Sequence, residues 1–425
     1  MYIFLRCCMG NNLLLSWRIV YVCLVLGGCL FVKGVYAEVS FDTVQFKYSK
    51  NDIVLTKHDD GFLIDDAGKM YAFNKKIIIL SLLSADEISQ LHDEIKQVQV
   101  IANIGSELVY WVTPRSEYFF DVYLALSKHQ DVLEIEPDIA PVTKLVTSGT
   151  SRQTSSVLVS QNAPLCDKPE NTVRVAIIDD GFDFTHPEFD DLTVLFEYDP
   201  DEKTLATSAK NPTDYHGTRV VGVIAAKQDN VGVEGFAPTS EIIAIRQVST
   251  WSSSIILAFQ VAKLMKADVI NCSWVLPLLS GITSLVIENI ASASNAPIIV
   301  VSAGNSGKKA CEVNHLSALS SVVVIGAINK NGNVAEFSNY GQCVDYYAPS
   351  SIESTSLNGY VNFGGTSSSA AIVSGVVAQL KACGVEYPLT KLTMVENILP
   401  AHVVNKNNIK SVTLIRSTGS EINEH

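Results

Sequence analysis

The sequence predicts an α/β protein in which a parallel sheet flanked by helices follows a smaller α+β unit. Beyond about residue 149, short continuous apolar runs alternate with helical stretches, which is the pattern of a parallel sheet buried on both faces. Before residue 147 the order is strand, helix, strands, helix, strand. The chain has 425 residues and is 47% hydrophobic, so both units can bury a core.

The first 37 residues are predicted to be a signal peptide. Two arginines precede the apolar run Ile19–Val32, and a small-x-small cleavage site ends at Ala37. We therefore expect a secreted or periplasmic protein. Cys29 follows Leu-Gly-Gly, which leaves open the alternative of a lipoprotein anchored at that cysteine. No later segment is apolar enough for a membrane helix, so no stable membrane span is expected.

Residues 38–147 form the smaller unit. A β-type run at Lys76–Leu80 is followed by Ser84 and Glu87, which are spaced as a capping box and predict a helix to about Gln97. Alternating apolar residues then return, a second helix is expected over 118–129, and a final strand over 132–135. The residues before Lys76 indicate one or two extra hairpins.

Residues 148–425 form the larger unit. Strand cores are expected at 173–178, 242–245, 269–271, 298–302 and 322–325, with helices at 217–226, 255–265 and 285–293. A further helix begins near Gly365 and stops at Gly384, which is a typical C-cap residue. Active sites in such sheets lie at the carboxyl ends of the strands, so the residues there are the first candidates for function.

The strand ends carry residues suited to acyl transfer. Asp179 follows the first strand, His216 opens a helix, Asn305 follows a later strand within Ala-Gly-Asn-Ser-Gly, and Ser367 opens the last helix. Acyl transfer needs a nucleophilic hydroxyl, a base, a carboxylate that orients the base, and donors for the oxyanion. We predict that Ser367 is the nucleophile, His216 the base and Asp179 its orienting partner.

Longer strings around these residues resemble the subtilisin-like serine proteases, the subtilase family. They are AIIDDGFDFTHPEF, HGTRVVGVIAAKQDNVGVEGFAP, VVSAGNSG and GGTSSSAAIVSG, and the resemblance covers nearly all of residues 165–400. It implies the same three catalytic residues in the order Asp, His, Ser, with Asn305 as an oxyanion donor. It also implies a serine endopeptidase that needs no cofactor for its chemistry. The alternative is an inert descendant that keeps the fold for binding.

The resemblance extends to residues 38–147, whose element order is similar to that of the ferredoxin-like inhibitory propeptides of the family. It implies a zymogen that processes itself between about Lys144 and Ser151, with its own propeptide as an intramolecular inhibitor. An unrelated small domain is the alternative. Expected partners are protein or peptide substrates. Nucleic acid is not expected, because the net charge is −13 and no basic cluster could neutralise phosphates.

The substrate-binding segments depart from the family pattern. Asp180, Arg219 and Ser273-Trp274 are typical of the kexin-like branch, yet no acid follows Trp274 nearby and no convertase P domain is expected, so we reject dibasic specificity. Val275 and Leu276 stand where glycines are usual, and the opposing segment near 249–254 is short. We predict a narrow cleft that prefers apolar residues. The expected substrate-binding residues are Ser273, Trp274, Val275, Ala303 and Gly304.

The resemblance also implies a candidate structural calcium site at Asp229 and Glu188, since calcium prefers oxygen ligands. Zinc is not expected, because the histidines lack partners at metal-ligand spacing.

Five cysteines remain after the signal peptide. By resemblance, Cys311 and Cys343 form a disulfide. A second bridge between Cys166 and Cys383 is expected because both should lie at the end of the sheet opposite the active site. Cys272, inside a strand, is expected to be a buried free thiol.

Overall fold

The computed structural model describes residues 43–48, 51–58, 61–142, 169–357, 359–384, 399–405 and 408–416. The expected signal peptide, the expected processing region 144–151 and Cys166 lie outside the described residues. Within the described ranges, no helix is both long enough and apolar enough to cross a membrane.

The N-terminal unit is built on an antiparallel sheet. Its strands are β1 (Thr43–Tyr48), β2 (Asn51–Lys57), β3 (Leu63–Asp65), β4 (Met70–Ser81), β5 (Ile95–Ile104), β6 (Glu107–Pro114) and β7 (Val132–Pro141). They lie in the order β1-β2-β3-β4-β6-β5, with β7 paired to β4. The helices are α1 (Ala85–Ser89), the 3-10 turn η1 (Ser116–Tyr118) and α2 (Phe119–Ser127). The predicted alternation of strands and helices is confirmed.

The predicted helix from Ser84 to about Gln97 is too long. The capping box is present, because Ser84 Oγ accepts from the Glu87 N–H and the Glu87 carboxylate accepts from the Ser84 N–H. The helix nevertheless ends at Ser89, and residues from Ile95 onward pair with β6. A capping box sets where a helix begins but does not set its length. Here the length is limited because the residues from Ile95 onward pair with β6.

The larger unit contains a nine-stranded sheet in the order β17-β18-β14-β13-β12-β11-β8-β10-β9. The strands are β8 (Arg174–Asp179), β9 (Val194–Tyr198), β10 (Glu241–Arg246), β11 (Val269–Cys272), β12 (Ile298–Ser302), β13 (Val323–Ile328), β14 (Tyr346–Pro349), β17 (Leu399–Asn405) and β18 (Asn408–Arg416). Along this sheet order, the strands from β14 to β9 pair in parallel with their neighbours. Strand β18 pairs with β14 in the antiparallel sense. The predicted parallel sheet is confirmed.

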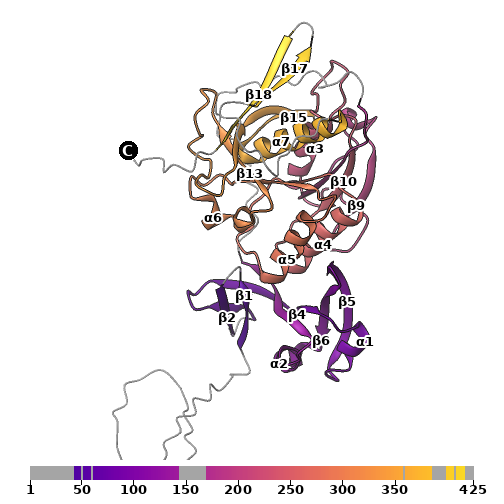
Figure 1. Ribbon diagram of the computed structural model, residues 1–425, viewed down its shortest axis with the longest axis vertical. Helices are drawn as coiled ribbons and strands as arrows, with labels where there is room; N and C mark the ends of the chain where they lie inside the picture. The colour runs from indigo at the N-terminus through magenta and orange to yellow at the C-terminus, as the bar shows by residue number, and fades with distance from the viewer. Residues whose placement is uncertain are drawn as a thin grey trace, which may run out of the picture. The chain divides into compact units, whose positions relative to one another are not determined.

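Helices cover both faces of this sheet. They are α3 (His216–Ala225), α4 (Ser252–Leu264), α5 (Gly281–Ala291), α6 (Ala310–Val313) and α7 (Gly365–Ala382), with 3-10 turns η2 (Pro187–Phe189) and η3 (His315–Ala318) and a separate hairpin of β15 (Ser351–Ser356) and β16 (Gly359–Gly364). Figure 1 shows α3 and α7 together on one face and α4 and α5 together on the other. Alternate side chains of β8 point to opposite faces of the sheet and join two hydrophobic cores. Val175 and Ile177 pack with α3 and α7 on one face. Ala176 and Ile178 pack with α4 and α5 on the other.

Candidate active site

Asp179 and His216 form a buried pair at the carboxyl edge of the parallel sheet. Asp179 is the last residue of β8 and His216 the first of α3. His216 Nδ1 lies 2.8 Å from Asp179 Oδ1, and the two side chains are 5% and 0% exposed. A Cβ at Gly217 would lie 3.0 Å from Asp179 Cβ and 2.5 Å from the Gly181 carbonyl oxygen, so only glycine lets the helix start this close to the strand.

The charges around His216 favour its protonated form. Burial by itself lowers the pKa of His216, but the Asp179 carboxylate outweighs burial, with help from Asp180, and the pKa is raised. Asp180 Oδ1 accepts the Gly217 N–H at 3.0 Å and so holds the first turn of α3. Burial, together with the Asp179 charge, raises the pKa of Asp180 to about 7.

Ser367 lies in the first turn of α7, on the same face of the sheet as α3. Its Oγ–H donates to the Ser273 carbonyl oxygen at 2.9 Å, and Ser273 Oγ donates to the Ser367 carbonyl oxygen at 3.1 Å. In the part of the chain that the structure describes, Ser367 has no hydrogen bond to His216. The structure therefore brings Asp179 to His216 and Ser273 to Ser367, while the last link of the predicted triad requires rotation of the serine side chain. Such links are often long before substrate binds.

Asn305 is oriented by the start of α7. Its Oδ1 accepts the Thr366 N–H at 2.8 Å, and the Gly304 N–H donates to Thr366 Oγ1 at 3.1 Å. A Cβ at Gly365 would lie 3.0 Å from Asn305 Nδ2, so this nitrogen stands beside the residue that begins the helix. The side-chain amide thus lies beside the first residues of α7, the helix that carries Ser367 in its first turn.

Asn339 supports this loop, and sequence reasoning assigned it no role. Its Nδ2 donates to the Ala303 carbonyl oxygen at 2.8 Å, and its Oδ1 accepts the N–H groups of Ser306 and Lys308 at 3.1 and 3.0 Å. The only sequence signal was its place in the connecting string EFSNYGQC, within the family resemblance. One buried side chain therefore holds the loop that carries Asn305.

The predicted substrate-binding residues separate into two groups. Trp274 is 5% exposed and its Nε1 donates to the Ile178 carbonyl oxygen at 2.7 Å, so its ring belongs to the core. Val275 and Gly304 face each other, because a Cβ at Gly304, where φ is +100°, would lie 2.9 Å from Val275 Cγ1. Ala303 is fully buried and contributes its carbonyl oxygen to Asn339. Ser273 is 1% exposed and Gly304 is also buried, whereas Val275 is partly exposed, so Val275 is the better placed candidate for side-chain contact with a substrate.

A buried ion network positions the segment that leads to His216. Arg246, the last residue of β10, lies 2.9 Å from Asp199 Oδ2 and 2.7 Å from Asp214 Oδ2. Lys210 also pairs with Asp199 at 2.9 Å. The sequence did not indicate this network, because its members are spread over almost fifty residues of loop and strand. Asp214 lies two residues before His216, so the network fixes the approach to α3.

A second pair of buried carboxylates lies on β7 of the N-terminal unit. Glu136 accepts from Ser280 Oγ at 2.5 Å and from the Ile282 N–H at 3.1 Å, at the start of α5. Asp138 accepts from both the N–H and the Oγ of Ser253, at 3.0 and 2.7 Å, at the start of α4. Each acid thus caps a helix of the larger unit, and burial raises the pKa of both acids, that of Glu136 to about 8.

Trp111 adds an aromatic contact at the same place. Its Nε1 donates to Asp138 Oδ2 at 3.1 Å. Lys203, from the loop after β9, places its Nζ 3.2 Å from the centre of the indole ring, and Lys76 does so at 3.6 Å. Burial, with the neighbouring Lys76 charge, lowers the pKa of Lys203 to about 8. A cation of the larger unit therefore lies against the N-terminal sheet.

The residues expected to bind calcium have other partners. Glu188 Oε1 accepts from the Val233 N–H at 3.2 Å and from the Tyr360 O–H at 2.5 Å, and only its Oε2 is buried without a partner. Asp229 accepts from the Val231 N–H at 3.0 Å and pairs with Lys227 at 3.2 Å. Within the described residues, no group of three or more metal-ligating side chains is found. The Lys227 ammonium thus occupies Asp229, while Glu188 Oε2 is buried without a partner, and the calcium site stays a prediction.

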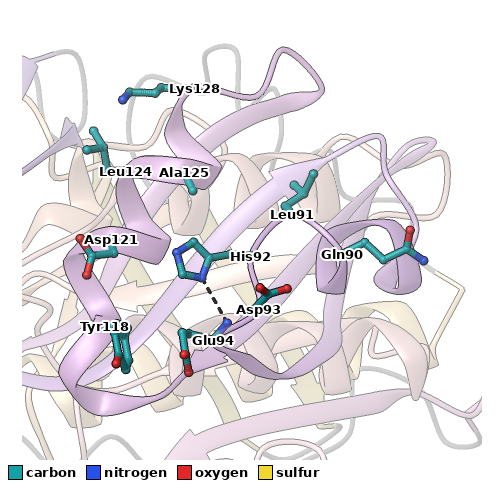
Figure 2. A pocket seen from close by; sticks show the side chains of 10 residues that line it. All are labelled: Gln90, Leu91, His92, Asp93, Glu94, Tyr118, Asp121, Leu124, Ala125 and Lys128. Carbon is teal, nitrogen blue, oxygen red and sulfur yellow. Dashed lines mark hydrogen bonds between the residues drawn. The ribbon is translucent and has the colours of Figure 1, made fainter.

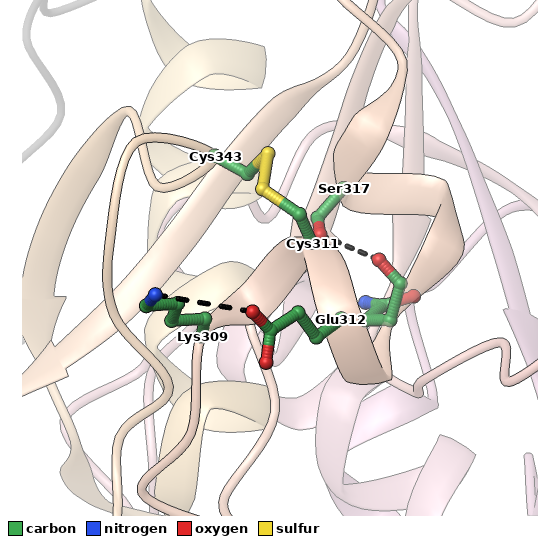
Figure 3. The surroundings of a disulfide bond; sticks show 6 residues. Lys309, Cys311, Glu312, Ser317 and Cys343 are labelled. Atoms are coloured by element: carbon green, nitrogen blue, oxygen red, sulfur yellow. Dashed lines mark hydrogen bonds and ion pairs between the residues drawn. A yellow bond between two sulfur atoms is a disulfide. The ribbon is translucent and has the colours of Figure 1, made fainter.

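The structure contains the Cys311–Cys343 disulfide, which joins α6 to the loop before β14 (Figure 3). The same view shows the Lys309–Glu312 ion pair beside it. Cys383 is also disulfide-bonded, and its expected partner Cys166 lies outside the described residues. Cys272 is a buried free thiol, as predicted. Burial raises its pKa, so it has little thiolate character.

A cavity of ≈ 660 Å³ lies in the N-terminal unit, away from all of these residues (Figure 2). It opens between α2 and the loop that precedes β5. Its lining side chains are Gln90, Leu91, His92, Asp93, Glu94, Tyr118, Asp121, Leu124, Ala125 and Lys128. His92 Nδ1 accepts the Glu94 N–H at 3.1 Å, and Arg115 pairs with Glu94 at 3.1 Å. The polar groups of His92 and Glu94, which could contact a ligand, are thus already paired within the loop before β5 or with Arg115.

A parallel sheet with helices on both faces and candidate catalytic groups at its carboxyl edge defines the class of this protein. Residues 170–411 match the Subtilase family, and the chain belongs to that family. It is 33% identical over 218 residues to subtilisin of Bacillus pumilus, covering 49% of this chain and 76% of that protein. It is 31% identical over 222 residues to the thermophilic serine proteinase of Bacillus sp. (strain AK1), covering 50% and 52%. The chain thus spans about half the length of some relatives.

Two solved structures share the fold over 72% of this chain, each with a TM-score of 0.54. One is fervidolysin from Fervidobacterium pennivorans, a keratinolytic enzyme related to subtilisin, at 21% identity and 54% coverage of that chain. The other is the epidermin leader peptide processing serine protease of Staphylococcus aureus, at 18% identity and 89% coverage. These likenesses establish the fold. The kexin-like features stay a prediction.

Proposed function

We propose that the protein is a serine endopeptidase that hydrolyses peptide bonds through an acyl-enzyme on Ser367. The observation that carries the proposal is the buried pair of Asp179 and His216, 2.8 Å apart, at the sheet edge where α3 and α7 begin. A histidine held by a buried carboxylate presents its other ring nitrogen as a base. Membership of the subtilase family supports the same chemistry.

The reaction begins when Ser367 leaves the Ser273 carbonyl oxygen and turns toward His216. As Oγ attacks the carbonyl carbon of the scissile bond, His216 Nε2 takes the proton, and Asp179 stabilises the imidazolium. His216 then gives that proton to the leaving amine as the carbon–nitrogen bond breaks. Water, deprotonated by His216, next attacks the acyl carbon and releases Ser367 with its proton restored.

Asn305 and the backbone N–H of Ser367 would hold the negative oxygen that forms in both steps. The support for Asn305 is the fixed orientation of its amide, whose oxygen is held by the Thr366 N–H. Donors that are fixed before the reaction need no reorganisation when charge develops.

We further propose that residues 38–147 are an inhibitory propeptide and residues 148–425 the catalytic domain. Two observations support this: Glu136 and Asp138 cap α5 and α4 of the catalytic domain, and Lys203 stacks on Trp111. Side chains that satisfy helix ends of another unit also help those helices to form, as expected of a propeptide that assists folding.

Secretion through the signal peptide over 1–37 belongs to the same proposal. The Cys311–Cys343 disulfide supports it, because such bonds persist in oxidising compartments. For the loop over 227–233, we propose support by Lys227 and Tyr360 in place of calcium.

A fluorophosphonate probe tests the central proposal, since it reacts with activated serines. We expect labelling of the processed protein, with loss of labelling in Ser367→Ala. Ser368→Ala is the matched control and retains labelling, because Ser368 Oγ donates to the Gly365 carbonyl oxygen within the same turn. If the processed wild type is not labelled, the protein is an inert member of the family. Sequencing the N-terminus of the processed chain then locates the cleavage site, which we expect between Lys144 and Ser151.

A further inference from the structure

A buried chain of hydrogen bonds in the larger unit ends on the backbone of Ser367. Ser374 Oγ donates to Asn271 Oδ1 at 2.9 Å, and Asn271 Nδ2 donates to Ser273 Oγ at 2.9 Å. Ser273 Oγ then donates to the Ser367 carbonyl oxygen at 3.1 Å. All four residues are at most 2% exposed, so these polar groups depend on one another for partners.

Two neighbouring elements supply this chain at matching spacings. Asn271 lies in β11 and Ser273 is two residues further on, so their side chains lie on the same side of the strand. Ser367 and Ser374 are seven residues apart in α7, which is about two helical turns, so they share one side of the helix. The chain therefore ties the end of β11 to α7 at two points, one in the first turn and one two turns later.

The chemistry of the groups fixes the direction of the chain. A carbonyl oxygen can only accept, so the Ser273 hydroxyl must donate to Ser367. The Ser273 oxygen is then left as an acceptor, which the amide nitrogen of Asn271 fills. The amide oxygen in turn needs a donor, and the Ser374 hydroxyl supplies it. If the amide were turned over, its oxygen would compete with the Ser367 carbonyl oxygen for the Ser273 proton.

Ser273 makes a second contact with Ser367, and the proposed reaction treats the two contacts differently. The Ser367 Oγ–H donates to the Ser273 carbonyl oxygen and must leave it to reach His216. The bond from Ser273 Oγ involves only the backbone of Ser367, so it can stay in place. The backbone of the nucleophile is thereby held while its side chain turns.

We propose that Asn271 and Ser374 are positioning residues for Ser367, and that they act through the hydroxyl of Ser273. The proposal rests on the proposed endopeptidase function. Asn271 directs the Ser273 hydroxyl toward Ser367, and Ser374 keeps the Asn271 amide from turning over. A misplacement of about 1 Å in a reacting group can cost about 100-fold in rate. Both residues are fully buried, so they should affect kcat rather than KM.

Steady-state kinetics on processed variants test the proposal. Asn271→Ala frees the Ser273 hydroxyl to turn to another acceptor, so kcat should fall about 3- to 10-fold, the usual effect of one hydrogen bond. KM should change less than about 2-fold. Ser374→Ala should lower kcat about 3-fold. A rise in KM at unchanged kcat in these variants would overturn the proposal.

Ser369→Ala is the matched control for Ser374→Ala. It removes a hydroxyl of α7 that is equally buried but donates to carbonyl oxygens at the end of β14. It should change kcat less than about 2-fold, even where it lowers Tm. An equal loss of kcat in Ser369→Ala and Ser374→Ala would mean that any buried hydroxyl of α7 has this effect, and the proposal would fail.

A Ser273→Ala background separates positioning from general support of the fold. The link to Ser367 is already cut there, so adding Asn271→Ala or Ser374→Ala should lower kcat no further. Losses that add in full would contradict a path through the Ser273 hydroxyl. If circular dichroism shows that Asn271→Ala does not fold, Ser374→Ala carries the same comparison. If the processed wild type cleaves no peptide, the proposed endopeptidase function fails, which is a different result from additive losses.

Discussion

Two sites in this molecule bury carboxylates, and they use them differently. Asp179 in the catalytic domain is paired with an imidazole that can change its charge. Glu136 and Asp138 on β7 are paired with hydroxyl, indole and backbone donors that cannot. A buried acid beside an ionisable group can direct a proton, whereas one beside fixed neutral donors serves mainly to hold parts together. The group paired with a buried acid therefore determines whether the acid takes part in catalysis or holds two parts of the chain together.

The same change of Asp to Asn at the two sites gives the largest contrast. Asp179→Asn should lower kcat about 10⁴-fold, the cost known for the orienting acid of such triads, because His216 is left in the wrong tautomer. Asp138→Asn should leave the kcat of the fully processed enzyme unchanged, since the processing that we propose would remove the residue. Steady-state kinetics on the processed proteins measure both. A comparable loss in both variants would mean that the N-terminal unit stays part of the working enzyme.

The next largest expected effect tests the role of Asn305 in the candidate active site. Asn305→Ala should lower kcat about 10²- to 10³-fold with little change in KM, a cost already known for oxyanion donors of the subtilisin type. The serine remains activated, so labelling by a fluorophosphonate should persist at a reduced rate. Asn339→Ala is the informative comparison, because it removes the support of the loop without touching the oxyanion. Full activity in Asn305→Ala would exclude Asn305 from that role.

On the docking side, removal of a cap should destabilise the unprocessed protein. In a full-length Ser367→Ala background, which cannot cleave itself, Asp138→Ala should cost about 1–2 kcal/mol and lower Tm by about 2–4 °C. The exposed Glu117→Gln serves as the control and should leave Tm unchanged. Calorimetry of the full chain measures the shift. An unaltered Tm for Asp138→Ala would show that the capping contacts contribute nothing to the zymogen.

A smaller effect concerns pH. His216 acts as a base only when neutral, so a raised pKa places the acid limb of kcat/KM above the ordinary value of about 6.5. Asp180→Asn removes a nearby negative charge that favours the protonated imidazole but keeps an acceptor for the Gly217 N–H. The acid limb should then move to lower pH, by about one unit or less. A limb that stays in place would exclude a charge effect of Asp180 on His216.

The smallest expected effect concerns the loop over 227–233. With Lys227 on Asp229 and Tyr360 on Glu188, a chelator should change Tm by less than about 2 °C. Thermal unfolding with a chelator and with added calcium measures this. Stabilisation by calcium of more than about 5 °C would restore the metal site implied by the family resemblance.

Local sequence signals predicted much of the fold and of the candidate site. The strands and helices of the parallel sheet follow from apolar runs and their spacing. The catalytic candidates Asp179, His216 and Ser367 were recognisable because each stands at the end of a strand or the start of a helix. The helix after Ser84 was overextended, since its length depends on pairing between β5 and β6 that no local signal reports.

By itself, therefore, the sequence determined the order of the elements and which residues end each strand, because these depend on neighbours a few positions away. Tertiary structure alone decided which carboxylates meet which donors. Asp138 finds Ser253 across 115 residues, and Glu136 finds Ser280 across 144. Asp201 likewise reaches Ser249 across 48. Such pairs exist only once the packed sheets have brought distant loops and helix ends together and excluded water, so no pattern in the chain announces them.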